Sequence, residues 1–173
     1  MKPENILIDA NGYLRITDFG LSRMSSIKCP SGKDCFVGTP EYFAPEVVMN
    51  QGYGKEVDLW AFGAIIFEML VGTPPFYTTN KQELYAKIRF AEPIYPPEMS
   101  PVVKDLIKGL LRKQPGRRLG SAKGIKEIKS HQWFKDMDFE QLLKKNYEPP
   151  FVPVMKNVCD LDYFDEVYTG MQL

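Results

Sequence analysis

The sequence predicts a mainly α fold with a short β-hairpin near its start, a long loop and an extended C-terminal tail. Three observations support this prediction. Two short apolar segments flank an Asn-Gly pair, a nearly all-apolar stretch has the length of a helix, and prolines recur from residue 149 onward. With 173 residues, 44% of them hydrophobic, the chain can bury one core.

The hairpin is predicted over residues 6–17, where β-branched and apolar residues flank the turn at Asn11-Gly12. Asn-Gly between such segments is the strongest short-range signal for a hairpin. Because the two ends of an antiparallel hairpin meet, we expect Asn5 and Asp18 to lie close together.

A long loop and a series of helices follow the hairpin. Residues 21–45 are rich in Ser, Gly, Pro and Lys and have no helical period, which is typical of a functional loop. Apolar periodicity, together with Ser and Pro at helix starts and Gly and Pro at helix ends, predicts the helices. They are expected at residues 58–71, 81–90, 101–111 and 125–130.

Composition excludes several classes of function. The 22 basic and 22 acidic residues cancel, which gives no support for nucleic acid or an anionic membrane as a partner. No apolar run approaches the roughly 20 residues of a membrane span. The three cysteines, Cys29, Cys35 and Cys159, fit no metal-ligand spacing and indicate reduced thiols. The expected location is therefore the cytoplasm, with the nucleus as the alternative.

The residues at the two ends of the hairpin suit a nucleotide-bound metal ion. Mg²⁺ prefers hard oxygen ligands and takes one or two from the protein beside phosphate oxygens and water. The amide of Asn5 and the carboxylate of Asp18 would supply such oxygens, and Lys2 adds a charge for the γ-phosphate. Each motif is weak alone, since Asp18-Phe19-Gly20 by itself predicts only a turn.

Taken in order, these motifs and the later ones resemble the eukaryotic protein kinases. "GTPEYFAPE", "EMLVGTPPF", "HQWF" and the tail motif "PPFVP" are similar to the AGC group of serine/threonine kinases. The resemblance implies a protein kinase-like C-lobe over residues 1–134, with the long loop as its activation loop. Residues 135–173 would be part of the AGC C-terminal tail. The motifs lie at Lys2–Asn5, Asp18–Gly20, Gly38–Glu46, Asp58–Trp60 and Arg118.

The resemblance implies ATP and Mg²⁺ as cofactors. Asn5 and Asp18 would hold the metal, and Lys2 would stabilise the phosphoryl group in transfer. Leu7 would form the floor under the adenine, and Thr39 would hydrogen-bond Lys2. The positions implied to bind the nucleotide are Lys2, Glu4, Asn5, Leu7, Thr17 and Asp18.

Three acidic residues match AGC positions that recognise arginines upstream of the phosphorylated residue. They are Glu4, Glu41 and Glu68. Carboxylates pair with guanidinium groups through two parallel hydrogen bonds, so the implied substrates are proteins with basic residues near the phosphorylated Ser or Thr. The other interpretation of these acids is a solvated polar face.

Four further residues are implied to have structural roles. Gly20 would permit the backbone turn after Phe19. Glu46 and Arg118 would form a buried ion pair that, with Asp58, ties the substrate loop to the helical core. Because a buried charge is tolerated only when it is paired, loss of either partner should be costly.

The sequence departs from the family at two places. It contains no Gly-x-Gly-x-x-Gly, and the catalytic aspartate that precedes the lysine of Lys2-Pro3 in kinases is absent. We therefore expect a fragment that is inactive alone and needs the small lobe of a full-length kinase. The alternatives are a non-catalytic module that binds substrates or regulators, and a degraded remnant with no stable fold. Cys35 stands where AGC kinases usually carry a phosphorylatable Thr or Ser.

Overall fold

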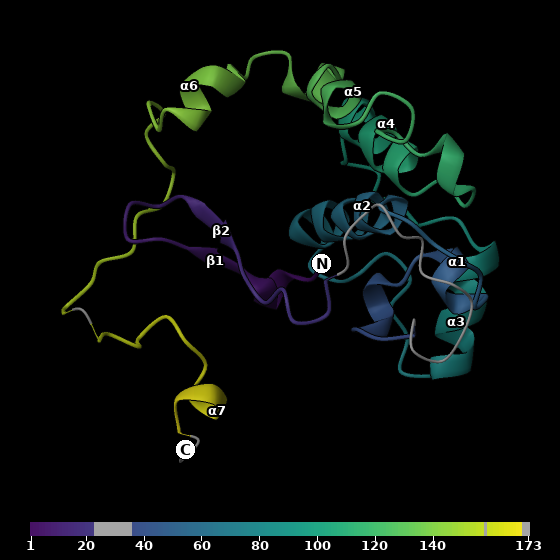
Figure 1. Ribbon diagram of the computed structural model, residues 1–173, viewed down its shortest axis with the longest axis horizontal. Coiled ribbons are helices and arrows are strands. Elements are labelled where there is room, and N and C mark those ends of the chain that lie inside the picture. Colours follow the sequence, from purple (N-terminus) through teal and green to yellow (C-terminus); the bar gives the residue numbers. More distant parts are fainter. Residues whose placement is uncertain (23–35, 158, 171–173) are drawn as a thin grey trace. The chain divides into compact units, whose positions relative to one another are not determined.

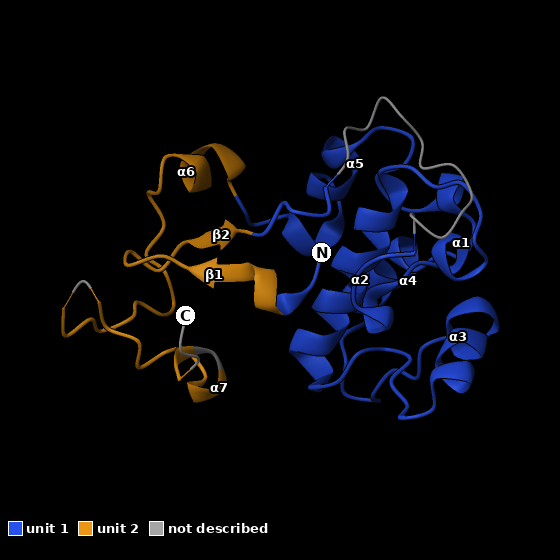
Figure 2. Ribbon diagram, turned by 60° about the horizontal axis from the view of Figure 1, so that its bottom comes forward, with its two compact units in different colours: residues 1–3, 18–137 blue, residues 4–17, 138–173 orange. Residues whose placement is uncertain are grey.

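The computed structural model describes residues 1–22, 36–157 and 159–170. Most of the predicted activation loop, including Cys35, lies outside the described residues. The chain forms two compact units, coloured separately in Figure 2. Unit 1 comprises Met1–Pro3 and Asp18–Met137, and unit 2 comprises Glu4–Thr17 and Asp138–Leu173.

Unit 1 is helical, and its four predicted helices are confirmed within two residues at each end. The order of helices along the chain is that of Figure 1. The short α1 was not predicted, because four residues carry no measurable period. The elements are η3 (Pro40–Tyr42), α1 (Pro45–Val48), α2 (Glu56–Val71), α3 (Lys81–Phe90), α4 (Pro101–Leu110), η4 (Pro115–Arg117), α5 (Ile125–Lys129) and η5 (Gln132–Phe134).

Local chemistry explains where these helices begin and end. The hydroxyl of Ser100 accepts a hydrogen bond from the Val103 backbone N–H at 3.4 Å, and Pro101 occupies the first turn of α4. Helix α2 ends at Gly72, whose φ of 89° is left-handed and whose N–H donates to the Glu68 carbonyl at 2.7 Å. Among the described helices, none combines the length and the apolar character that crossing a membrane requires.

The core of unit 1 forms where α2 packs against α4 (Figure 1). Gly63 makes this close approach possible, because a Cβ atom there would lie 2.7 Å from the Leu110 Cβ. Trp60 is fully buried and stacks on Phe76 with ring centroids 5.7 Å apart. Buried residues from α1, α3 and α5 complete the same cluster.

Unit 2 contains the hairpin, and its prediction is confirmed. Strands β1 (Ile6–Ile8) and β2 (Leu14–Ile16) are antiparallel, with Ile6 opposite Ile16. The connecting loop is longer than a two-residue Asn-Gly turn, since the Asp9 N–H donates to the Tyr13 carbonyl at 2.7 Å. A 3₁₀ turn, η1 (Pro3–Asn5), precedes β1.

The hairpin contacts the beginning of the tail within unit 2. The Tyr13 hydroxyl donates to the Tyr147 carbonyl at 2.6 Å, and Asp9 pairs with Lys145 at 3.4 Å. The Asp9 carboxylate also accepts the backbone N–H of Tyr13 and pairs with Arg15, and these contacts, the Tyr13 bond foremost, lower its pKa to about 2. Contacts across 134 residues thus hold hairpin and tail together.

The tail is largely irregular but includes two short helices, α6 (Phe139–Leu143) and α7 (Glu166–Thr169). Helix α7 interrupts the extended path expected after residue 149. Asp165 explains its start, because the side chain accepts a hydrogen bond from the Val167 N–H at 2.9 Å.

Candidate active site

Asn5 and Asp18, the two residues expected to hold a metal ion, lie at the end of the hairpin that is opposite its turn. The Thr17 N–H donates to the Asn5 carbonyl at 2.9 Å, which closes this end, and Asp18 follows directly in the chain. Asn5 is half-buried and belongs to unit 2, whereas Asp18 is exposed and belongs to unit 1. Their joint role in metal binding therefore stays a prediction.

A turn follows Phe19, where the Ser22 N–H donates to the Phe19 carbonyl at 3.0 Å, and the expected role of Gly20 in it stays a prediction. The left-handed conformation belongs to Asp18, with φ at 56°, whereas Gly20 does not have a positive φ. The Gly20 N–H instead donates to the Asp18 Oδ1 at 3.3 Å, a local bond that orients the carboxylate. Aspartate tolerates the left-handed region better than most residues, which explains how Asp18 adopts it two residues before Gly20.

The chemistry of this pair fits Mg²⁺ bound together with phosphate. An amide oxygen and a carboxylate oxygen are hard ligands of the kind that Mg²⁺ prefers, and Asp18 is exposed. In the described ranges, no group of three or more His, Cys, Asp or Glu side chains could hold a metal ion by itself. A metal here would therefore need oxygens from the nucleotide.

The other residues expected near the nucleotide are divided between the units. Leu7 is 40% exposed on β1, Thr17 is half-buried at the end of β2, and Glu4 is exposed in η1, all in unit 2. Lys2 and Thr39 belong to unit 1 and are half-buried, but no hydrogen bond joins them in the part of the chain that the structure describes.

Two of the three acids expected to bind substrate arginines lie in unit 1. Glu41 is in η3 and Glu68 is in the last turn of α2, and both are half-buried. The Tyr42 hydroxyl donates to the Glu68 Oε2 at 2.6 Å, which connects the η3 segment to α2. Sequence reasoning missed Tyr42; its position beside Glu41 in the "GTPEYFAPE" motif was the available signal.

A small pocket of unit 1, about 110 Å³, brings together Thr39 and Asp58. Met1 and the rings of Tyr42 and Tyr53 also line it. Asp58 is exposed in the first turn of α2, and its expected structural role stays a prediction. The buried pair consists of Glu46 and Arg118 alone.

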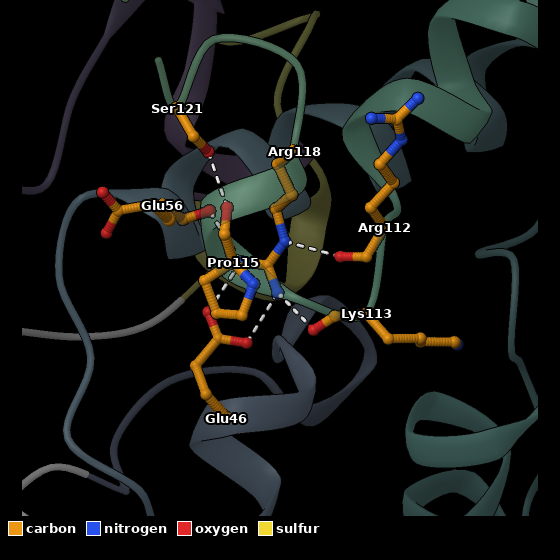
Figure 3. A network of polar contacts seen from close by, with 7 residues as sticks. All are labelled: Glu46, Glu56, Arg112, Lys113, Pro115, Arg118 and Ser121. Carbon is orange, nitrogen blue, oxygen red and sulfur yellow. Dashed lines mark hydrogen bonds and ion pairs between the residues drawn. The ribbon is translucent and has the colours of Figure 1, made fainter.

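The Glu46–Arg118 pair joins α1 to the segment after α4 (Figure 3). Both Arg118 amino groups donate to the Glu46 carboxylate at 2.6 Å, and the two side chains are 0% and 4% exposed. Arg118 also donates to the backbone carbonyls of Arg112 and Glu56, each at 2.9 Å. All three nitrogens of the guanidinium group are therefore hydrogen-bonded, which is the condition for burying the charge.

Lys113 lies beside this network on a partly buried site. Its ammonium group donates to the Ile88 carbonyl at 2.8 Å and lies 4.3 Å from the centre of the Phe76 ring. Burial lowers the pKa of Lys113 from its ordinary value of 10.5 to about 8; the nearby Glu92 opposes this shift and Arg118 adds to it.

We expect the free energy of unfolding to depend on pH because of this lowered pKa. Between pH 8 and 10.5 the unfolded chain binds more protons at Lys113 than the folded chain, so its contribution to stability rises with pH. Lys113→Met should remove that rise. Urea unfolding at pH 7, 8, 9 and 10 measures it as a pH-dependent difference between wild type and variant; a pH-independent difference would contradict the assignment.

Comparisons with known proteins agree with this geometry. Residues 1–134 match the protein kinase domain. The chain is 43% identical over 169 residues to serine/threonine-protein kinase YPK2/YKR2 of Saccharomyces cerevisiae. It is 46% identical to protein kinase 2 of Dictyostelium discoideum, and 42% identical to serine/threonine-protein kinase gad8 of Schizosaccharomyces pombe.

These matches cover 98% of the chain but only 25%, 35% and 30% of the respective relatives. The chain thus spans between a quarter and about a third of the length of these proteins. The matched domain includes the η3 segment, α2 and the Glu46–Arg118 pair. The chain belongs to the protein kinase family, and its relatives are serine/threonine kinases of the AGC type.

Proposed function

We propose that the protein is a serine/threonine kinase that transfers the γ-phosphate of ATP to proteins with basic residues near the phosphorylated site. The observation that carries the proposal is the hydrogen bond from Tyr42 to Glu68. It holds one oxygen of this carboxylate against the segment that contains Glu41 and leaves the other oxygen for a guanidinium group. Residues 1–134 would form the C-lobe and residues 135–173 part of the C-terminal tail.

Asn5 and Asp18 would hold Mg²⁺, which when bound neutralises charge on the phosphates of ATP. Lys2 would place its ammonium group beside the transferred phosphoryl, whose equatorial oxygens carry the developing charge. Leu7 and Thr17 would contact the nucleotide, and Glu4 would join the two other acids in binding substrate arginines. These roles are inferred from the motifs together with the exposure of the residues.

We further propose that the 173-residue chain binds substrate but requires the small lobe and the catalytic aspartate of a complete kinase for transfer. The second candidate function is a non-catalytic module that binds substrates or regulators through the same acids. Cytoplasm or nucleus is the proposed location. Both candidate functions include peptide binding. Phosphoryl transfer in the presence of the small lobe and the catalytic aspartate would distinguish the kinase from the non-catalytic module.

Binding of a basic peptide tests the carboxylates directly. We expect a fluorescent serine peptide with two upstream arginines to bind about tenfold more weakly to Glu68→Gln and to Glu41→Gln, because each change removes a charge-assisted hydrogen bond. Glu98→Gln, which removes an exposed charge elsewhere in unit 1, is the matched control. Fluorescence polarisation gives the affinities of the wild type and the three variants; equal weakening by all three substitutions would contradict the proposal.

A further inference from the structure

A solvent-open hollow of about 550 Å³ lies in unit 1 beside the C-terminal end of α4. Its charged lining comes from three places: the segment after α3, the last turn of α4, and the segment that includes η4. We call it the basic hollow. It is lined by Lys108, Arg112, Lys113 and Arg117, with Glu92, Leu111 and Gln114.

The basic hollow concentrates positive charge in a chain that has none overall. Four cations and one acid give it a net charge of 4 − 1 = +3, against zero for the whole sequence. Within the described ranges, no carboxylate lies within ion-pair distance of any of the four cationic side chains. Glu92, the one acid of the lining, therefore offsets only part of the mutual repulsion of these charges.

Arg112 and Arg117 are positioned for an external anion. The Arg112 Nη1 donates to the Arg117 carbonyl at 2.9 Å, which anchors that guanidinium group while its other N–H groups remain available. In Figure 3 the Arg112 side chain points away from the Glu46–Arg118 pair. Both arginines are exposed, so an anion can reach them without any rearrangement of the core.

Helix stability accounts for only part of this cluster. A cation in the last turn of a helix interacts favourably with the helix dipole, and Lys108 is in the last turn of α4. Arg117 lies in η4, beyond the end of that helix, and Lys113 is directed at the rings of Trp60 and Phe76. The two exposed arginines, Arg112 and Arg117, are thus left without such an explanation.

We propose that the basic hollow binds a phosphorylated peptide segment of a partner protein. A phosphate group carries about −1.5 to −2 charges and three acceptor oxygens, which match the forked donors of the two arginines. The ammonium group of Lys108 would meet an acidic residue that flanks the phosphate. This site is separate from the acids Glu41 and Glu68, which would bind basic peptides.

The lining favours a peptide over other polyanions. It contains no aromatic side chain on which a nucleic-acid base could stack. Its one apolar residue, Leu111, is buried and cannot insert into a lipid layer. The acidic Glu92 in the lining disfavours a broad anionic surface more than a single phosphate at the two arginines.

Fluorescence polarisation with the 173-residue chain tests the proposal. The probe is a labelled peptide with one phosphoserine between pairs of aspartates, and its unphosphorylated counterpart is the first control. We expect the double variant Arg112→Gln/Arg117→Gln to bind the phosphopeptide at least about tenfold more weakly than wild type. The matched control, Lys123→Gln/Lys126→Gln, removes two exposed charges outside the hollow and should bind like wild type.

Two further measurements distinguish a phosphopeptide from free phosphate and from a lipid surface. Inorganic phosphate should compete only at far higher concentration than the peptide, and vesicles containing phosphatidylserine should not bind. Equal binding of both peptides, equal loss in the two double variants, or binding to vesicles instead of the peptide would overturn the proposal. Unfolding midpoints are measured for every variant, and the single variant Arg117→Gln replaces the double variant if the latter is not folded.

Discussion

Arg118→Leu should lower the free energy of unfolding of the chain by about 3–5 kcal/mol, because it leaves the buried carboxylate of Glu46 without its partner. The variant also leaves the carbonyls of Arg112 and Glu56 without the hydrogen bonds that Arg118 donates. Urea unfolding followed by circular dichroism measures the loss. A loss of this size is a large fraction of the roughly 5–15 kcal/mol that stabilises an ordinary domain.

Two controls show whether the loss comes from the buried charge. The double variant Glu46→Leu/Arg118→Leu should recover part of the stability, since it removes the unpaired carboxylate. Lys87→Met removes the exposed ion pair with Glu83, whose atoms lie 2.8 Å apart, and should cost no more than about 0.5 kcal/mol. If Arg118→Leu costs as little as Lys87→Met, the pair does not hold α1 to the core.

Trp60→Ala should lower the free energy of unfolding by about 3–5 kcal/mol, because it removes a fully buried aromatic ring from the centre of unit 1. The ring stacks on Phe76, and the charged groups of Lys113 and Arg118 each lie 5.1 Å from its centre. The cavity would therefore loosen both the core and the polar network beside it.

The second tryptophan of the chain, Trp133, provides the matched control. Its side chain is 44% exposed, so Trp133→Ala should cost less than about 1.5 kcal/mol. Trp60→Phe should also be mild, since the Trp60 Nε1 has no hydrogen-bond partner among the described residues and the change loses none. Equal losses for the two alanine variants in urea unfolding would show that Trp60 is not central to the core.

Local sequence patterns were sufficient for the elements that depend on local forces. The hairpin follows from the apolar residues around its Asn-Gly turn, and α4 follows from Ser100 and Pro101 at its start. Helices α1, α6 and α7 were missed, because four or five residues show at most a weak period, although the equally short α5 was predicted. Their formation depends on neighbouring segments.

Local sequence patterns could not predict contacts between residues that are far apart in the chain. The Tyr42–Glu68 bond spans 26 residues and the Tyr13–Tyr147 bond spans 134, and neither leaves a periodic trace. The turn at Asp18 shows a different limit. Glycine was the expected residue for unusual backbone geometry, but aspartate holds it here with φ at 56°.

Phosphoryl transfer by a chimera tests the central claim most directly. In it, the kinase residues that precede the matched region of the Saccharomyces cerevisiae relative are joined before residue 1. With labelled ATP, Mg²⁺ and an arginine-containing serine peptide, we expect transfer by the chimera and none by the 173-residue chain. Asp18→Ala in the chimera should reduce transfer at least about 100-fold. A folded chimera that transfers no phosphate, or that is indifferent to Asp18→Ala, would contradict the account.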